Sequence, residues 1–313
     1  MSRSEFAHLG GYEIVRPLAA GGMGAVYLAR DPAGRELALK VLHGDDPALR
    51  EMFGREVHAC LAFDHPGLPR VCSYGSERGV AYLAMDYVRG VDLVELVDTM
   101  RCANHALAIA IASSAADALD HAHRCGLVHR DVSPSNIMVT FEGDVKVIDF
   151  GIAAPIGTSH DGAICGKAAY IAPEQCLGDP VDARSDVWAL GVVLYELATG
   201  RPCFVGNSEL ACMLAVVRRD FVLPSELDPM FPRELEDVIL TALAVDPAQR
   251  YASAAELAGV LRELPCAYGP TIARLAIACA AQQARGGVTA RATASELSTK
   301  PELPIHFRPS AAA

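Results

Sequence analysis

The chain has 313 residues, of which 51% are hydrophobic, so it is long and apolar enough for one large domain or two smaller ones. Its formal net charge of −11 argues against nucleic-acid binding, because neutralising phosphates requires clustered Lys and Arg, and the sequence has no such cluster. No apolar run reaches the roughly 18 uncharged residues that cross a bilayer, and MSRSEFAHLG lacks the apolar segment of a signal peptide, so we expect a cytoplasmic protein without membrane insertion.

The ten cysteines are scattered along the chain without paired C-x-x-C spacing or a nearby His cluster. Neither a zinc site nor a disulfide framework is therefore expected.

The first part of the chain carries strand patterns. Residues 12–42 contain the short alternating runs YEIVRPLA, AVYLAR and ELALKVL, broken by GGMG and by the turn DPAG, and they predict a meander of antiparallel strands. Strand patterns return up to Tyr74 and again over residues 80–88. Between residue 42 and this second group of strands, residues 47–62 have helical spacing, with four apolar residues on one face: Leu49, Phe53, Val57 and Leu61.

Beyond Gly90 the apolar spacing is mostly helical. Residues 105–126 predict a long helix that stops at Gly126, and residues 137–151 predict a tight hairpin turning at 142–144. Further helical segments are predicted at residues 186–200, 210–217, 235–245 and 254–264. Strands followed by helices indicate an α+β protein rather than the alternating order of a doubly wound sheet.

The end of the chain has a different composition. The Ala-rich residues 273–285 predict one helix, whereas residues 286–313 lack periodicity and contain scattered Pro, Ser, Thr and Ala. We therefore expect a flexible tail after that helix. The sequence contains no internal repeat.

A glycine-rich stretch, AAGGMGAV, occupies residues 19–26. Residues without a side chain let backbone N–H groups approach an anion, although a glycine cluster by itself is equally compatible with a simple turn. A Rossmann dinucleotide loop is disfavoured because a strand pattern, not a helix, follows.

Three further motifs follow in order. HRDVSPSN, residues 129–136, places a carboxylate and a carboxamide five positions apart in a turn-rich stretch between apolar runs. The triplet DFG, residues 149–151, comes directly after the apolar strand VKVI, and IAPEQ spans residues 171–175.

In this order and spacing the motifs resemble those of the bacterial Hanks-type, eukaryotic-like serine/threonine protein kinases, over about residues 12–264. The resemblance implies a bilobal kinase fold, with a small antiparallel β-rich N-lobe over about residues 12–88 and a larger helical C-lobe over about 89–264. An N-terminal extension, residues 1–11, would precede this domain, and a C-terminal helix with its tail, residues 265–313, would follow it.

The resemblance also implies that ATP and Mg²⁺ bind between the lobes. Ala19 stands where the family has its first glycine, and if that position needs an unusual φ, alanine costs about 1–2 kcal/mol. The resemblance assigns these residues to the ATP site: Ala19, Gly21, Gly22, Gly24, Val26, Ala38, Lys40, Met85, Asp86, Val88 and Met138.

Lys40 and Glu56 match the ion pair that holds the α- and β-phosphates. A solvated surface charge is the usual state of either residue type, but Lys40 follows alternating apolar residues on a half-buried strand, where an ammonium needs a partner. Asp131 matches the residue that orients the substrate hydroxyl. Asn136 and Asp149 match the magnesium ligands, because a hard cation prefers oxygen donors.

Other matches imply structural roles. Glu174 would pair with Arg250, and Asp186 would cap the backbone of the catalytic loop. Arg130 matches the arginine that receives an activation-loop phosphate, for which Thr158 and Ser159 are candidates.

The sequence departs from the family at two related positions. Ser133 replaces the catalytic-loop lysine that contacts the transferring phosphoryl group, and Gly166–Lys167 replaces the Gly-Thr pair whose threonine bonds that lysine. We hypothesise that the cation has moved, so that Lys167 reaches the γ-phosphate beside Asp131 while Ser133 supplies the hydroxyl. Losing one preorganised donor at a developing anion typically costs about a hundredfold in rate, a deficit that an active enzyme would not leave open.

The sequence thus predicts a transferase that moves the γ-phosphoryl group of ATP to Ser/Thr hydroxyls of proteins, itself included, with a homodimer formed for autophosphorylation. The alternative is a pseudokinase that binds nucleotide as an interaction module; the retained Lys40, Asp131 and Asp149 argue against it. A small-molecule kinase of the same fold is a third reading, which IAPEQ disfavours because that segment shapes a peptide-binding ledge in protein kinases.

Overall fold

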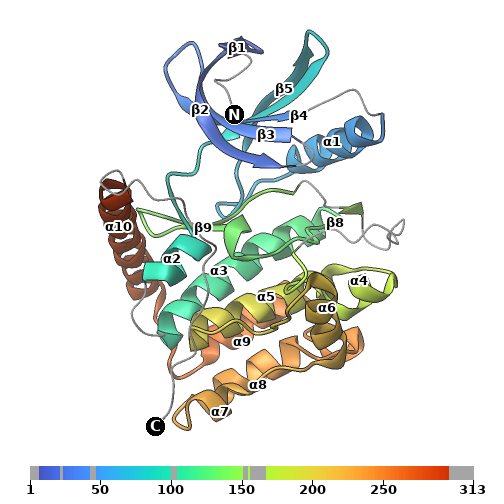
Figure 1. Ribbon diagram of the computed structural model, residues 1–313, viewed down its shortest axis with the longest axis vertical. Coiled ribbons are helices and arrows are strands. Elements are labelled where there is room, and N and C mark those ends of the chain that lie inside the picture. Colours follow the sequence, from blue (N-terminus) through green and yellow to red (C-terminus); the bar gives the residue numbers. More distant parts are fainter. Residues whose placement is uncertain are drawn as a thin grey trace.

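The computed structural model describes residues 7–21, 24–42, 47–99, 104–150, 154–155 and 167–295. Within these ranges the description is limited to the backbone at residues 21, 47–49, 52, 55–56, 59, 154–155 and 286–295. A strand-rich lobe lies above a larger helical lobe (Figure 1). This arrangement confirms the predicted α+β, bilobal fold.

The N-lobe is built on one antiparallel sheet with strand order β1-β2-β3-β4-β6-β5. The strands are β1 (His8–Leu9), β2 (Tyr12–Gly21), β3 (Gly24–Arg30), β4 (Glu36–Leu42), β5 (Val71–Glu77) and β6 (Val80–Asp86). The predicted turn at 31–34 joins β3 to β4, where Gly34 adopts a φ of +83°.

Helix α1 (Pro47–Cys60) packs on one side of this sheet through Phe53 and Val57, which are buried with Leu42 and Leu83. Because side chains alternate along a strand, Lys40 of β4 lies on the same side as Leu42, whereas its neighbours Leu39 and Val41 belong to the core of the other side. The predicted apolar face of the helix is only partly correct. Leu61 follows the end of α1 and is 46% exposed.

The C-lobe is organised around two buried helices, α3 and α5. The elements of this lobe are β7 (Gly90–Asp92), α2 (Leu93–Thr99), α3 (His105–Arg124), β8 (Leu127–Val128), the 3-10 turn η1 (Pro134–Asn136), β9 (Ile137–Thr140), β10 (Val145–Val147), β11 (Ala154–Pro155), α4 (Pro173–Leu177), α5 (Ala183–Thr199), α6 (Glu209–Arg218), α7 (Pro224–Leu227), α8 (Arg233–Ala242), the 3-10 turn η2 (Pro247–Gln249), α9 (Ala254–Glu263) and α10 (Pro270–Ser295).

Local signals in the sequence set the bounds of the long helix α3. The Asn104 side chain accepts a hydrogen bond from Leu107 N at its start, as an N-cap residue does. At the other end Gly126 has a φ of +83°, which a residue with a side chain adopts only with strain. Ala-rich stretches such as this one let neighbouring helices approach closely, and most of α3 is buried.

The predicted hairpin is also present. Strands β9 and β10 pair antiparallel across a turn at 141–144, and β7 joins them in a three-stranded sheet of order β10-β9-β7. This small sheet carries Met138 and lies below the N-lobe, next to α2 (Figure 1).

Helix α10 packs against α2, α3 and β9, at the edge of the C-lobe (Figure 1). Its buried face consists of Ile277, Ala281 and Ala284, and Arg274 forms an ion pair of 3.1 Å with Asp144 in the β9–β10 turn. The predicted helix over 273–285 is therefore present.

The same helix runs to Ser295, so residues 286–295 are helical and the expected start of the tail at residue 286 was wrong. Gly286 and Gly287 each weaken a helix by about 1 kcal/mol, but adding residues to a formed helix avoids the cost of nucleation. Among the described residues, no helix has both the length and the apolar composition needed to span a bilayer.

Docking of α10 should contribute to stability through its buried face. Ile277, only 2% exposed, leaves a cavity when replaced by alanine, so Ile277→Ala should lower the free energy of unfolding by about 2 kcal/mol or more. Ile272 on the same helix is 59% exposed, and Ile272→Ala should change the free energy of unfolding by no more than about 0.5 kcal/mol. Urea unfolding of both variants measures the difference; equal effects would contradict the packing of this face.

Candidate active site

A cavity of about 490 Å³ lies between the two lobes. Eight of the predicted nucleotide-site residues line it: Ala19, Val26, Ala38, Lys40, Met85, Asp86, Val88 and Met138. The glycines Gly21 and Gly24 pair with each other at the adjoining ends of β2 and β3, and Gly22 lies outside the described residues.

Two details of the glycine-rich stretch were not evident from its sequence. Ala19 lies in β2 opposite Val26, in extended backbone, so the penalty expected for alanine at an unusual φ does not arise. Gly24 is required for a different reason: a Cβ atom there would lie 2.1 Å from the carbonyl oxygen of Val41. The close approach of β3 to β4 therefore excludes a side chain.

The cavity is lined by charged residues of both signs. Lys40 lines it, and so do Asp92 and Glu95 at the start of α2. Glu95 N donates to Asp92 Oδ1 over 2.8 Å, which caps α2. Burial raises the pKa of Glu95, and the negative charge of Asp92 raises it further. Sequence patterns gave no signal for this acidic pair.

Lys40 and Asp149 meet across the cleft, with Nζ and Oδ1 2.8 Å apart. The Lys40 side chain is only 14% exposed, as its position on the strand predicted. Glu56 lies on α1, but its side chain is outside the description, so the Lys40–Glu56 pair stays a prediction.

Asp149 adopts a φ of +63°, the left-handed region that costs a residue with a side chain about 1 kcal/mol or more. The next residue, Phe150, is buried and anchors this conformation: its ring lies 4.9 Å from that of Phe63 and 4.5 Å from that of His129. The aromatic contacts hold the carboxylate at the cavity wall.

Asp131 and Asn136 are joined within the catalytic loop. Asn136 Nδ2 donates to the Asp131 backbone carbonyl over 2.8 Å and to Asp131 Oδ2 over 2.9 Å. Asp131 Oδ1 is buried and has no hydrogen-bond partner among the described residues. A buried acceptor without a donor costs about 1–3 kcal/mol, so this oxygen is suited to receive a hydrogen bond from an incoming hydroxyl.

Asp186 of α5 supports this loop from below. Its carboxylate accepts from the backbone N–H groups of His129 and Arg130, each over 2.8 Å, and from His123 Nε2 over 2.7 Å. The predicted capping role is therefore confirmed. Burial by itself would raise the pKa of Asp186, but the hydrogen bonds from His123 and the loop outweigh burial and hold the pKa below its ordinary value.

The comparisons with known proteins agree with this geometry. The sequence pattern of the protein kinase domain family matches residues 12–259. The chain belongs to the protein kinase family.

Proteins similar to this chain include bacterial serine/threonine kinases. A probable serine/threonine-protein kinase of Streptomyces coelicolor is 40% identical over 263 residues, covering 80% of this chain and 39% of that protein. Serine/threonine-protein kinase PknB of Mycobacterium tuberculosis is 41% identical over 259 residues, covering 79% of this chain and 41% of PknB. The chain thus spans about two fifths of the length of these relatives.

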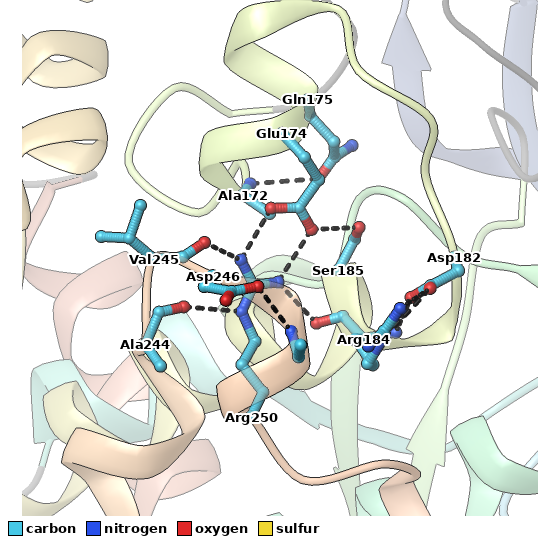
Figure 2. A network of polar contacts seen from close by, with 11 residues as sticks. Ala172, Glu174, Gln175, Asp182, Arg184, Ser185, Ala244, Val245, Asp246 and Arg250 are labelled. Carbon is cyan, nitrogen blue, oxygen red and sulfur yellow. Dashed lines mark hydrogen bonds and ion pairs between the residues drawn. The ribbon is translucent and has the colours of Figure 1, made fainter.

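In this member of the family, the end of the activation segment is fixed by a buried ion pair between Glu174 and Arg250 (Figure 2). The Arg250 guanidinium donates to both carboxylate oxygens, over 2.8 and 2.7 Å, and the Ser185 hydroxyl donates to Oε1. Backbone carbonyls of Arg184, Ala244 and Val245 accept the remaining Arg250 N–H groups. All donors of the guanidinium are thus satisfied, as burial of this charge requires.

Gln175, which sequence reasoning did not single out, joins this segment to the catalytic loop of the kinase. Its side-chain nitrogen donates to the Arg130 carbonyl over 3.2 Å, and its oxygen accepts from Ala172 N over 3.1 Å. The available signal in the sequence was a glutamine directly after a Pro-Glu pair at the start of a helix.

Lys167 reaches the catalytic loop of the kinase. Its Nζ donates to the hydroxyl of Ser135, which is itself 3.3 Å from the Ser133 hydroxyl. The hydroxyl that meets the ammonium is therefore that of Ser135, not that of Ser133 as we expected. Thr158 and Ser159 lie outside the described residues, so the phosphate-binding role of Arg130 stays a prediction.

Arg250 should be far more sensitive to substitution than a partly exposed arginine nearby. Arg250→Met leaves Glu174 as an unpaired buried charge, so it should lower the free energy of unfolding by about 3–5 kcal/mol. Arg184 pairs with Asp182 at a side-chain exposure of 33%, and Arg184→Met should cost no more than about 1 kcal/mol. Urea unfolding measures both. Adding Glu174→Gln to Arg250→Met should restore part of the loss; no restoration would contradict an unpaired charge as its cause.

Proposed function

We propose that this chain is an active, ATP-dependent serine/threonine kinase that phosphorylates proteins. The observation that carries the proposal is the convergence of Lys40, Asn136 and Asp149 on one cavity, with Asp131 bonded to Asn136 in the same loop. The names of the bacterial relatives support the choice of Ser/Thr hydroxyls as acceptors.

The residues fit a bound magnesium nucleotide. Asn136 Oδ1 and the Asp149 carboxylate offer the oxygen donors that a hard cation prefers, at the wall of the same cavity. Bound Mg²⁺ would neutralise charge that develops on the transferring phosphate. Lys40 would hold the α- and β-phosphates, and the backbone of residues 86–88 would face the adenine.

Asp131 would act on the substrate hydroxyl. Its orphaned Oδ1 accepts the proton as the hydroxyl oxygen attacks phosphorus and the bond to the ADP oxygen breaks. The hydrogen bonds from Asn136 to the other oxygen and to the Asp131 carbonyl keep the carboxylate in this orientation.

Lys167 would supply the cation that the catalytic loop lacks. The contact of its Nζ with Ser135, a residue that lines the cavity, supports this role. Two unit charges of opposite sign about 4 Å apart attract each other by about 4 kcal/mol at an effective dielectric near 20. An ammonium beside Ser135 would therefore stabilise the negative charge of a bound γ-phosphate.

Transfer of labelled phosphate from Mg·ATP to generic protein substrates tests the proposed activity. Asp131→Asn keeps the shape of the side chain but removes the proton acceptor, so turnover should fall about a hundredfold or more. A pseudokinase would bind nucleotide without turnover in either form, and a small-molecule kinase would leave proteins unlabelled. Either result would overturn the proposal.

Lys167→Ala should lower turnover by about two decades, because a preorganised donor to the developing anion is lost. Ser133→Lys combined with Lys167→Thr restores the usual family arrangement and should recover most of the activity. Initial rates at saturating ATP measure both variants. Parent-like turnover of Lys167→Ala would show that the cation has not moved.

Autophosphorylation through a homodimer is a further part of the proposal, motivated by Thr158 and Ser159 and by Arg130, which is only 7% exposed in the catalytic loop. Mass spectrometry after incubation with ATP should find phosphate within residues 152–167. An active preparation without phosphate in this range would exclude autophosphorylation of the activation segment as the event that activates the protein.

A further inference from the structure

Ser135 is placed between the two groups that the proposed chemistry must align. It lies in η1, lines the nucleotide cavity, and accepts a hydrogen bond from Lys167 Nζ. Its own hydroxyl proton is directed at Asn136 Oδ1, over 3.3 Å. A serine hydroxyl has one donor and two acceptor sites, so both contacts can exist together.

The polar chain continues to the catalytic carboxylate. Asn136 Nδ2 donates to Asp131 Oδ2 over 2.9 Å, so the order is Lys167, Ser135, Asn136 and Asp131. One hydroxyl thus connects the relocated ammonium with the amide that would bind metal.

The two sides of Ser135 differ in rigidity. The loop side is held by Pro134, by the bond of Asn136 N to the Ser133 carbonyl over 2.9 Å, and by burial of Ser133 at 0% exposure. The Lys167 side is an exposed four-carbon side chain, and such a chain has about 2 kcal/mol of rotamer freedom. A cation on this flexible stem needs a fixed acceptor if it is to stand over the reacting phosphate.

We infer that Ser135 is a positioning residue, whose hydroxyl fixes the ammonium of Lys167 over the catalytic loop and orients the metal-binding amide of Asn136. The inference rests on the proposed role of Lys167 as the cation for the transferring phosphoryl group. The competing explanation is an ordinary loop hydroxyl, whose loss would change stability alone.

Steady-state kinetics of Ser135→Ala separate these explanations. Turnover should fall about tenfold, since a hydrogen bond to a charged group is lost, while KM for ATP should rise only as far as the weakened γ-phosphate contact requires, because Lys40 and the adenine contacts are intact. Ser135→Thr keeps the hydroxyl and should recover most of the turnover. Ser114→Ala is the matched control: Ser114 is also half-buried, but its hydroxyl donates to the Ala110 carbonyl within α3 and should leave turnover unchanged.

A double-mutant cycle tests whether Ser135 acts through Lys167. In the Lys167→Ala background, Ser135→Ala should change turnover by less than about threefold, because the ammonium is absent and only the contact of Ser135 with Asn136 remains to be lost. The same tenfold loss in both backgrounds would overturn positioning of Lys167.

Nucleotide affinity gives a readout that does not depend on turnover. Calorimetric binding of Mg·ADP and of a magnesium complex of a non-hydrolysable ATP analogue reports the contribution of the γ-phosphate. Ser135→Ala and Lys167→Ala should each reduce the preference for the ATP analogue, whereas Ser135→Thr and Ser114→Ala should preserve it.

The two proposals can fail separately. If Lys167→Ala turns over like the parent, the relocated cation is wrong and the positioning inference is overturned with it. If Lys167→Ala is slow but Ser135→Ala is as fast as the parent, with the same preference for the ATP analogue, only the positioning inference is overturned.

Discussion

A single buried carboxylate, that of Asp186, organises the catalytic loop. Two consecutive backbone N–H groups and the His123 ring donate to it, so residues 129 and 130 are fixed and residue 131 follows in a defined direction. Because its pKa is lowered in the folded state, the charged form stabilises the fold at neutral pH. This contribution is lost only as the pH falls below the ordinary carboxyl range. The orientation of Asp131 therefore depends on a group that touches no substrate.

A second buried charge, Arg250, fixes the segment that faces this loop. It binds Glu174, and the adjacent Gln175 reaches across to the Arg130 carbonyl. The catalytic loop and the end of the activation segment are thus each supported by a charge inside the C-lobe and are bonded to each other. Lys167 stands only a few residues before this anchored segment, which brings its ammonium within reach of Ser135.

The resemblance of the motifs to a known family was sufficient to predict Asp131, Asn136 and Asp149 as neighbours, and Glu174 as the partner of Arg250, because each family motif carries a chemical role as well as a position. Spacing could not predict that Lys167 meets Ser135 and not Ser133, since that choice depends on how two distant segments meet. The need for glycine at position 24 depends on the distance between β3 and β4, and the length of α10 on its docking against the C-lobe. Neither feature can be predicted from the local sequence alone.

The acidic pair at the start of α2 adds negative potential to the nucleotide cavity. Asp92 and Glu95 line the cavity, and the ammonium of Lys40, which also lines it, is paired with Asp149. A competitive inhibitor with a basic amine that reaches α2 would be attracted to these two carboxylates. Selective compounds for this cavity could therefore be designed on its polarity as well as on its shape.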